Sequence, residues 1–202
     1  MDSKPTIVSP FTGIQFLDAW SDPDRLIADK GTHLSPLLQD LLTWRGSLTQ
    51  RLENRMGKKV ELQLISHDHV HSWPDDWDVW KDSDAFDLET ALLVRNAWLV
   101  LGGNRLVFAH SQIVINNVPE SDYHSIKEGN QALGYLFIAN NGQLTRKDLQ
   151  LNRVLLCDSP LFSDFRIMDP CWCRRSLFHV NDVLLARIIE IFPPMIKKKK
   201  GS

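Results

Sequence analysis

The chain has 202 residues, of which 43% are hydrophobic and 24% are charged, and its formal net charge is −2. This length is typical of one globular domain, or of one domain with a modest extension, and is enough to bury a core without cross-links. The charge balance gives no basic excess that would attract nucleic acid or an anionic membrane surface. The one basic run, residues 197–200, predicts a solvated basic tail over 197–202.

Cysteine usage argues against disulfides and against a zinc site. There are three cysteines, an odd number, and the chain shows no secretory leader. Cys171 and Cys173 are spaced as C-x-C without a second pair, which is not the ligand pattern of a zinc knuckle. No apolar run has the length of a membrane span. We therefore expect a cytoplasmic protein without a stable membrane anchor.

The N-terminal part of the chain predicts an irregular segment followed by two helices. Residues 1–33 are rich in Pro, Asp, Ser and Thr and are expected to form an irregular lead-in. Ser35 and Pro36 are typical of a helix N-cap and first helical position, and an apolar stripe of leucines follows them. A second helical segment, "SLTQRLENRM", should end at Gly57.

A strand and an excursion come next. Apolar and polar residues alternate over 58–70, "KKVELQLISHDHV", and this pattern predicts a strand. Residues 72–87 are rich in Asp and Trp around a proline, which indicates a long surface excursion or a lid.

The remainder of the chain is dominated by strand patterns. Two β-rich runs flank Gly102–Asn104 and predict a hairpin. Residues 121–137 predict a helix and a turn, 146–156 a strand, and 173–192 a hairpin that turns at Asn181-Asp182. Because strands outnumber helices and connections are short, we expect an α+β fold: a single domain with a mostly antiparallel sheet and helices on one face.

Two charged residues stand alone on apolar strand faces. Arg95 shares a face with leucines and an alanine, and Glu190 is the one polar residue among its same-face neighbours on the last strand. An isolated charge on such a face is costly unless it is paired, hydrogen-bonded or lines a pocket. Either the two residues face outward or pair with each other, or they line a buried pocket that holds one cation and one carboxylate.

The position of His110 depends on the hairpin turn. If Gly103-Asn104 is a two-residue turn, His110 lies on the same face as Arg95, one diagonal away. If the loop has three residues, His110 moves to the other face. The sequence leaves both registers open.

Four segments, in this order along the chain, carry a resemblance to a known family: "LLQDLLTWRGSLTQRLE", "ALLVRNAWLVLGGNRLVFAHSQIV", "ALGYLF" and "CWCRRSLFHVNDVLLARIIEIFPP". Together they resemble the chorismate–pyruvate lyase family over residues 34–196. The resemblance implies an antiparallel sheet with an internal ligand site closed by flaps. It also implies the conversion of chorismate to 4-hydroxybenzoate and pyruvate, the first committed step of ubiquinone biosynthesis. The expected enzyme is a monomer whose one partner is its small-molecule substrate, and it needs no cofactor or metal.

The resemblance also assigns site residues. Arg95 and Glu190 match the polar, catalytic and substrate-binding positions of the family, and Leu48 and Leu133 match positions whose main chain lies near the ligand. His110 stands where the family usually carries a second arginine and is carried over as a substrate-binding position. In an apolar wall, Glu190 should have a raised pKa.

Two further groups of residues have two interpretations each: the arginines at 174–175 and the histidines at 67–71. Arg174 or Arg175 could supply the missing cation, or could be a solvated strand end. His67, His69 and His71 alternate like metal ligands. A metal site would also need an acidic or His ligand from elsewhere, so an exposed strand end is the expectation.

Two rival functions remain at this stage. A non-catalytic module that binds an aromatic acid could have the same fold, because effector domains of some transcription regulators resemble this lyase. A metal-dependent hydrolase built on the three histidines is the second rival.

Overall fold

A computed structural model describes residues 9–70, 79–80, 91–129, 131–139, 144–157, 159–165 and 169–194. The expected basic tail, 197–202, and most of the excursion at 72–87 lie outside the described residues.

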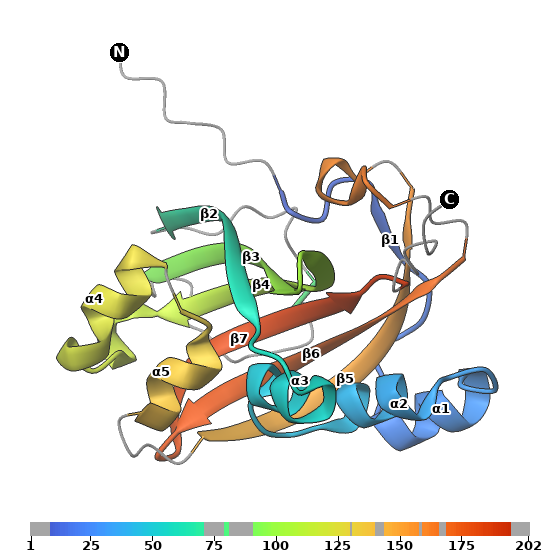
Figure 1. The fold of residues 1–202 in the computed structure, drawn as a ribbon, viewed down its shortest axis with the longest axis horizontal. Helices are drawn as coiled ribbons and strands as arrows, with labels where there is room; N and C mark the ends of the chain where they lie inside the picture. Colours follow the sequence, from blue (N-terminus) through green and yellow to red (C-terminus); the bar gives the residue numbers. More distant parts are fainter. Residues whose placement is uncertain are drawn as a thin grey trace.

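One antiparallel sheet forms the centre of the molecule (Figure 1). Its strand order is β1-β5-β6-β7-β4-β3-β2, and every neighbouring pair is antiparallel. This confirms the α+β class and the mostly antiparallel sheet. The strands are β1 (Ile14–Phe16), β2 (Glu61–Val70), β3 (Leu92–Leu101), β4 (Asn104–Val114), β5 (Leu144–Leu156), β6 (Cys171–Val180) and β7 (Val183–Phe192).

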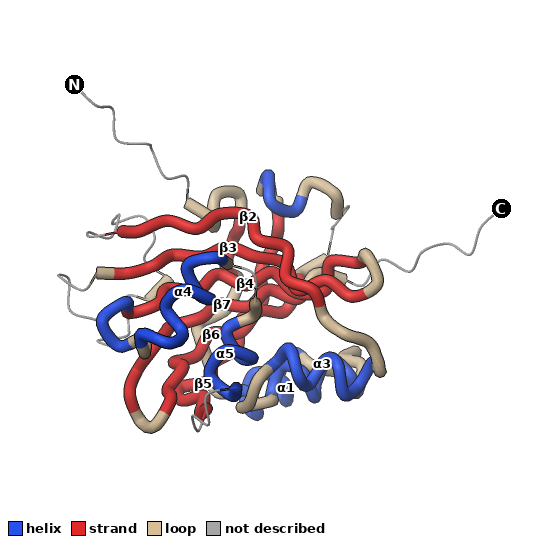
Figure 2. The backbone as a smooth tube through the Cα atoms, turned by 60° about the vertical axis from the view of Figure 1, so that its left-hand side comes forward, coloured by secondary structure: helices blue, strands red, loops and turns tan. Residues whose placement is uncertain are grey.

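The α-helices of the described chain lie on one side of this sheet (Figures 1 and 2). Two begin where the sequence predicts: the Ser35 and Ser47 side chains cap them, and Gly57, at φ 64°, ends the second. The α-helices are α1 (Pro23–Lys30), α2 (Pro36–Thr43), α3 (Leu48–Met56), α4 (Glu120–Glu128) and α5 (Leu133–Ala139), and short 3₁₀ turns η2 (Ile115–Asn117) and η3 (Pro160–Phe162) complete the list.

The expectation of an irregular lead-in over 1–33 is wrong for its described part. Ile14–Phe16 pairs with β5, and Ser21 forms a further bridge to that strand. The Asp22 side chain caps α1, which starts at Pro23. The same Pro and Asp residues that suggested irregular structure therefore start a helix.

Both faces of the sheet are covered, by different parts of the chain. On one face, leucines of α1, α2 and α3 pack against β3, β5, β6 and β7. On the other face, Phe11, Trp80 and Phe162 pack against aromatic and aliphatic side chains of β3, β4 and β6. Polar side chains in the interior of either face must therefore be bonded to protein or bind a ligand.

A bulge in the first hairpin decides which face each residue of β4 takes. The turn is Gly102-Gly103, both with positive φ, one residue earlier than predicted. The register then shifts between Leu99 and Val100, so that Arg95 opposes Ser111 and Asn96 opposes His110.

Candidate active site

A small pocket of about 40 Å³ lies between the sheet and the starts of α3 and α5. Strands β2, β3, β4, β5, β6 and β7 all contribute lining residues to this pocket. Its charged lining residues are Arg95, Arg146 and Glu190, and the others include Ser47, Leu48, Thr49, Leu62, Ala97, Leu99, Ala109, Ser111, Ala132, Leu133, Gly134, Phe178 and Ile188. Arg95 and Glu190 thus meet in one buried pocket, and the outward-facing reading is wrong.

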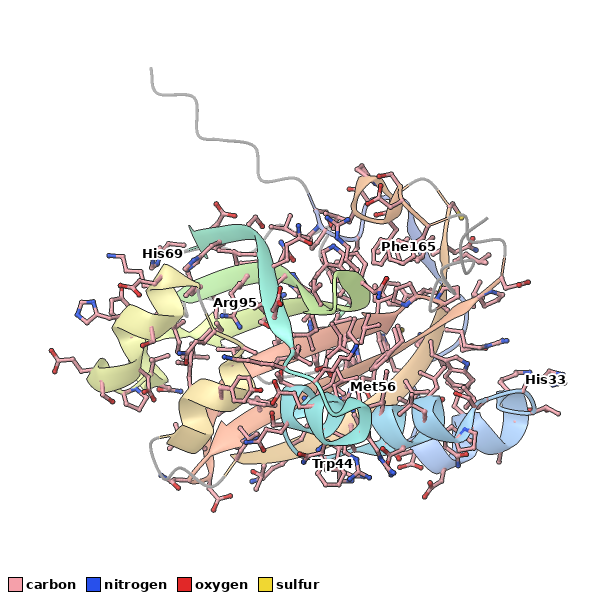
Figure 3. All side chains as sticks on the ribbon, in the orientation of Figure 1. His33, Trp44, Met56, His69, Arg95 and Phe165 are labelled. Carbon is pink, nitrogen blue, oxygen red and sulfur yellow. The ribbon has the colours of Figure 1, made fainter. Side chains whose placement is uncertain are left out.

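Arg95 supplies a cation on β3, on the helix-covered side of the sheet (Figure 3). It is 3% exposed, and its Nη1 donates to the Gln131 carbonyl at 3.0 Å. Burial lowers the pKa of Arg95 to about 10, so the guanidinium is charged at neutral pH. Its Nε is buried without a hydrogen-bond partner in the described structure.

Glu190 is held between two arginines. Its Oε2 accepts from Arg174 Nε at 2.5 Å and from Arg146 Nη1 at 3.0 Å, and its Oε1 accepts from Arg146 Nη2 at 3.3 Å. Burial acts to raise the pKa of Glu190, but the two guanidiniums together outweigh it, and the pKa lies below its ordinary value. The prediction of a raised pKa is therefore wrong, and Glu190 is an ionised carboxylate at neutral pH.

Arg174 is not a solvated strand end. It is fully buried, and its Nη1 donates to the carbonyls of Leu41, Leu42 and Trp44 at the end of α2. Arg174 therefore joins a helix C-terminus to the Glu190 carboxylate. Arg175 projects to the other face, where its Nη1 donates to the Val79 carbonyl at 2.6 Å.

Arg146 is the second cation of the pocket, and it was not predicted from the sequence. It pairs with Glu190 and donates to Ser176 Oγ at 2.6 Å, and it lies 4.8 Å from the centre of the Phe178 ring. A register shift between Lys147 and Gln150, with Asp148 at φ 49°, puts Arg146 and Leu151 on the same face of β5. Strict alternation would place them on opposite faces, which conceals the pattern.

Leu48 and Leu133 both line the pocket, each as the first residue of its helix. The two helix starts touch closely, because a Cβ on Gly134 would lie 2.3 Å from Ser47 Oγ. Only glycine fits at this contact, which explains the Leu-Gly pair in "ALGYLF".

His110 lies on the opposite face from Arg95 and is not part of the pocket. Its Nδ1 lies 2.8 Å from Asn96 Oδ1, and its Nε2 lies 2.9 Å from Gln112 Nε2. Burial, and the charge of Arg187, lower the pKa of His110 to about 3, so the ring is neutral. The assignment of His110 to substrate binding is therefore wrong, because the bulge turns it to the other face.

The histidines of β2 do not form a metal centre with other described residues. The His67 and His69 rings stack with centroids 6.5 Å apart, and His71 lies outside the described residues. Within the described ranges, no cluster of three or more His, Cys, Asp or Glu could hold a metal ion.

Val79 and Trp80, which belong to the excursion considered as a lid, lie on the face opposite the pocket. No helix among the described residues is long and apolar enough to cross a membrane.

Comparison with known proteins gives both sequence and fold relatives. A family model described as chorismate pyruvate-lyase Rv2949c-like matches residues 42–200. A probable chorismate pyruvate-lyase of Nitrosospira multiformis is 28% identical over 170 residues, which cover 81% of this chain and 89% of the relative.

Among solved structures, PhnF from Mycobacterium smegmatis is similar with a TM-score of 0.58 at 12% identity, over 75% of this chain and 65% of PhnF. The effector domain of PhnF, solved separately, gives a TM-score of 0.55 at 10% identity, over 74% of this chain and 89% of that domain. These identities show a shared fold alone. The family match covers most of the sequence, and the chain therefore belongs to the Rv2949c-like chorismate pyruvate-lyase family.

Proposed function

We propose that this protein is a lyase that converts chorismate to 4-hydroxybenzoate and pyruvate. One observation carries the proposal: Arg95 on β3 and Glu190 on β7 line the same buried pocket. A cation and a carboxylate, both under 5% exposed and both facing an internal space, suit a small polar acid more than a purely structural role. The family membership supports the same reaction.

The reaction is an elimination that ends in an aromatic ring. The C4 hydrogen leaves as a proton, and the bond between C3 and the ether oxygen breaks. The ring becomes 4-hydroxybenzoate, and the departing enolpyruvate takes up a proton to become pyruvate. Aromatisation drives the step, so the side chains need to orient the substrate and assist the proton transfer.

Arg95 suits the ring carboxylate. Its planar guanidinium can donate two parallel hydrogen bonds to the two oxygens of a carboxylate. Burial strengthens this interaction, because little water competes for either partner.

Glu190 suits the C4 side of the ring. As an ionised carboxylate it accepts a hydrogen bond from the C4 hydroxyl, and it can accept the C4 proton. Its two arginine partners make it a weaker base than an isolated buried carboxylate. We therefore assign Glu190 mainly to positioning, with proton acceptance as the role that its variants test.

A non-catalytic module for an aromatic acid is the second candidate, favoured by the fold shared with the PhnF effector domain. Such a module would bind 4-hydroxybenzoate and leave chorismate intact. The monomeric state, the cytoplasmic location and the supply of 4-hydroxybenzoate for ubiquinone stay predictions.

The test is incubation of purified protein with chorismate, with and without a chelator, followed by chromatography. The lyase proposal expects 4-hydroxybenzoate in both samples at many equivalents per protein. A folded sample that binds 4-hydroxybenzoate in a titration but leaves chorismate intact would support the binding module and overturn the lyase.

A further inference from the structure

The guanidinium of Arg146 has an unused edge. Its Nη1 donates to Ser176 and Glu190, and one hydrogen of Nη2 is directed to Glu190. Its Nε is buried and has no hydrogen-bond partner among the described residues. The Nε hydrogen and the second Nη2 hydrogen lie on one side of the planar group. Such an edge matches the two oxygens of a carboxylate.

Arg95 has the same feature on another wall of the pocket. Its Nε is also buried without a partner in the described structure, while Nη1 donates to the Gln131 carbonyl. A buried donor without an acceptor is rare in folded proteins and calls for an explanation. Two such donors, on two arginines of one pocket, are explained by a ligand with two acceptor groups.

The charges of the site support the same conclusion. Three buried arginines, Arg95, Arg146 and Arg174, accompany Glu190. Glu190 is the one carboxylate among the pocket-lining residues that the structure describes. The excess is two positive charges, and uncompensated buried charges are costly. A dianionic ligand would neutralise the excess, whereas a monoanion would neutralise half of it.

We propose that Arg146 binds a second carboxylate of the ligand and makes the pocket selective for dianions over monoanions. The inference rests on the proposed function and assigns the two carboxylates of its substrate: the ring carboxylate to Arg95 and the enolpyruvyl carboxylate to Arg146. Arg174 does not compete for this role, because it is not among the residues that line the pocket: its Nε serves Glu190 and its Nη1 the carbonyls at the end of α2, although its Nη2 is also buried without a partner among the described residues. The second cation, which His110 does not provide, is thus supplied by Arg146 on β5.

The test compares two stable ligands by calorimetric titration, so it needs no turnover. One is 3-(carboxymethoxy)benzoate, a diacid with its ether at the ring position that carries the ether in chorismate. The other is the corresponding amide, 3-(2-amino-2-oxoethoxy)benzoate, which has nearly the same shape and one carboxylate. Wild-type protein should bind the diacid more tightly by about tenfold or more, since one buried charge-assisted contact differs.

Arg146→Gln should reduce this preference to within about threefold, while Arg95→Gln should weaken both ligands in parallel. Arg146→Lys keeps the charge beside Glu190 but lacks the fork, so the preference should fall at least about threefold in a folded protein even where Arg146→Gln does not fold. Arg153→Gln is the matched control on the same strand, because Arg153 pairs with Asp18 away from the pocket. It should leave both affinities unchanged.

A wild-type protein that binds diacid and amide equally, or Arg146 variants that keep the full preference, would overturn the inference. These outcomes are separate from the test of the lyase. A preference that depends on Arg146, in a protein that does not turn over chorismate, would overturn the proposed function alone. If the protein turns over chorismate but its preference for the diacid over the amide does not change in the Arg146 variants, this inference alone would be overturned.

Discussion

Arg174 and Glu190 occupy directly opposed positions on β6 and β7, and Arg174 Nε lies 2.5 Å from Glu190 Oε2. Both residues are buried, and Arg146 approaches the same carboxylate from β5. Glu190 is therefore at once a pocket residue and the anion that holds three strands together. Its replacement should affect stability and activity, and the two effects need separate measurements.

Glu190→Gln should lower the free energy of unfolding by about 3–5 kcal/mol, because it leaves two buried guanidiniums without their anion. Denaturant titration measures this. Asp164→Asn is the control, since Asp164 pairs with Arg105 at the surface with 71% of its side chain exposed. That change should cost under about 1 kcal/mol. Equal effects of the two substitutions would show that Glu190 contributes no more than a surface ion pair.

Glu190→Gln also distinguishes positioning from proton transfer in the protein that remains folded. A glutamine still accepts a hydrogen bond from the C4 hydroxyl but cannot take a proton. If Glu190 serves mainly to position, as its lowered pKa favours, kcat should fall less than about tenfold. A loss of roughly 10²–10⁴-fold, with KM little changed, would instead assign it the proton transfer.

Arg95→Ala should raise KM and weaken 4-hydroxybenzoate binding together, each by at least about tenfold, because substrate and product share the ring carboxylate. Steady-state kinetics and product titration measure the two quantities. Arg105→Ala, in the next strand and half-exposed, is the matched control and should change neither. Unchanged product affinity in Arg95→Ala would mean that another cation, Arg146 first, holds that carboxylate.

His110 should make stability depend on pH. In the unfolded chain its pKa is about 6.5, whereas burial lowers the folded value to about 3. Below pH 6.5 the unfolded state therefore binds a proton that the folded state does not, and stability falls as pH drops from about 6.5 towards 3. His110→Gln should reduce this slope in urea titrations across that range. An identical slope in wild type and variant would contradict the neutral, buried His110.

The three alternating histidines should be dispensable for catalysis. Replacing His67, His69 and His71 together by Ala should leave kcat/KM within a few-fold, since His67 and His69 are not among the residues that line the pocket. The measurement is steady-state kinetics with chelator and with added zinc. A metal site would be shown by two results together: the wild type loses activity with the chelator and regains it with zinc, and the triple variant is inactive under both conditions.

Local signals predicted much of this fold. Ser35 and Gly57 mark helix ends by capping chemistry, and the Asn181-Asp182 turn adopts the positive φ angles that such residues tolerate. Because Arg95 and Glu190 are isolated charges on apolar strand faces, the sequence also indicated them as candidate pocket residues. The two residues whose place in the site was not predicted share one physical cause: a β-bulge shifts facing by one residue without a clear sequence mark.

Two bulges account for the residues that were misplaced. The shift after Leu99 turned His110 away from the pocket, and the shift after Lys147 brought Arg146 into it. The lowered pKa of Glu190 could not be predicted either, because it depends on Arg146 and Arg174. These residues lie on β5 and β6, and the faces that they take on those strands had to be known first.

The most direct test is the stoichiometry of the two products. Chorismate is incubated with wild-type protein, 4-hydroxybenzoate is quantified by chromatography, and pyruvate is quantified in the same samples by a coupled reduction to lactate. The expected result is one pyruvate for each 4-hydroxybenzoate, at many equivalents per protein, and a large loss of both in Arg95→Ala. Folded wild-type protein that releases neither product above the spontaneous rate, or that forms them equally well with Arg95→Ala, would contradict a lyase site built on Arg95 and Glu190.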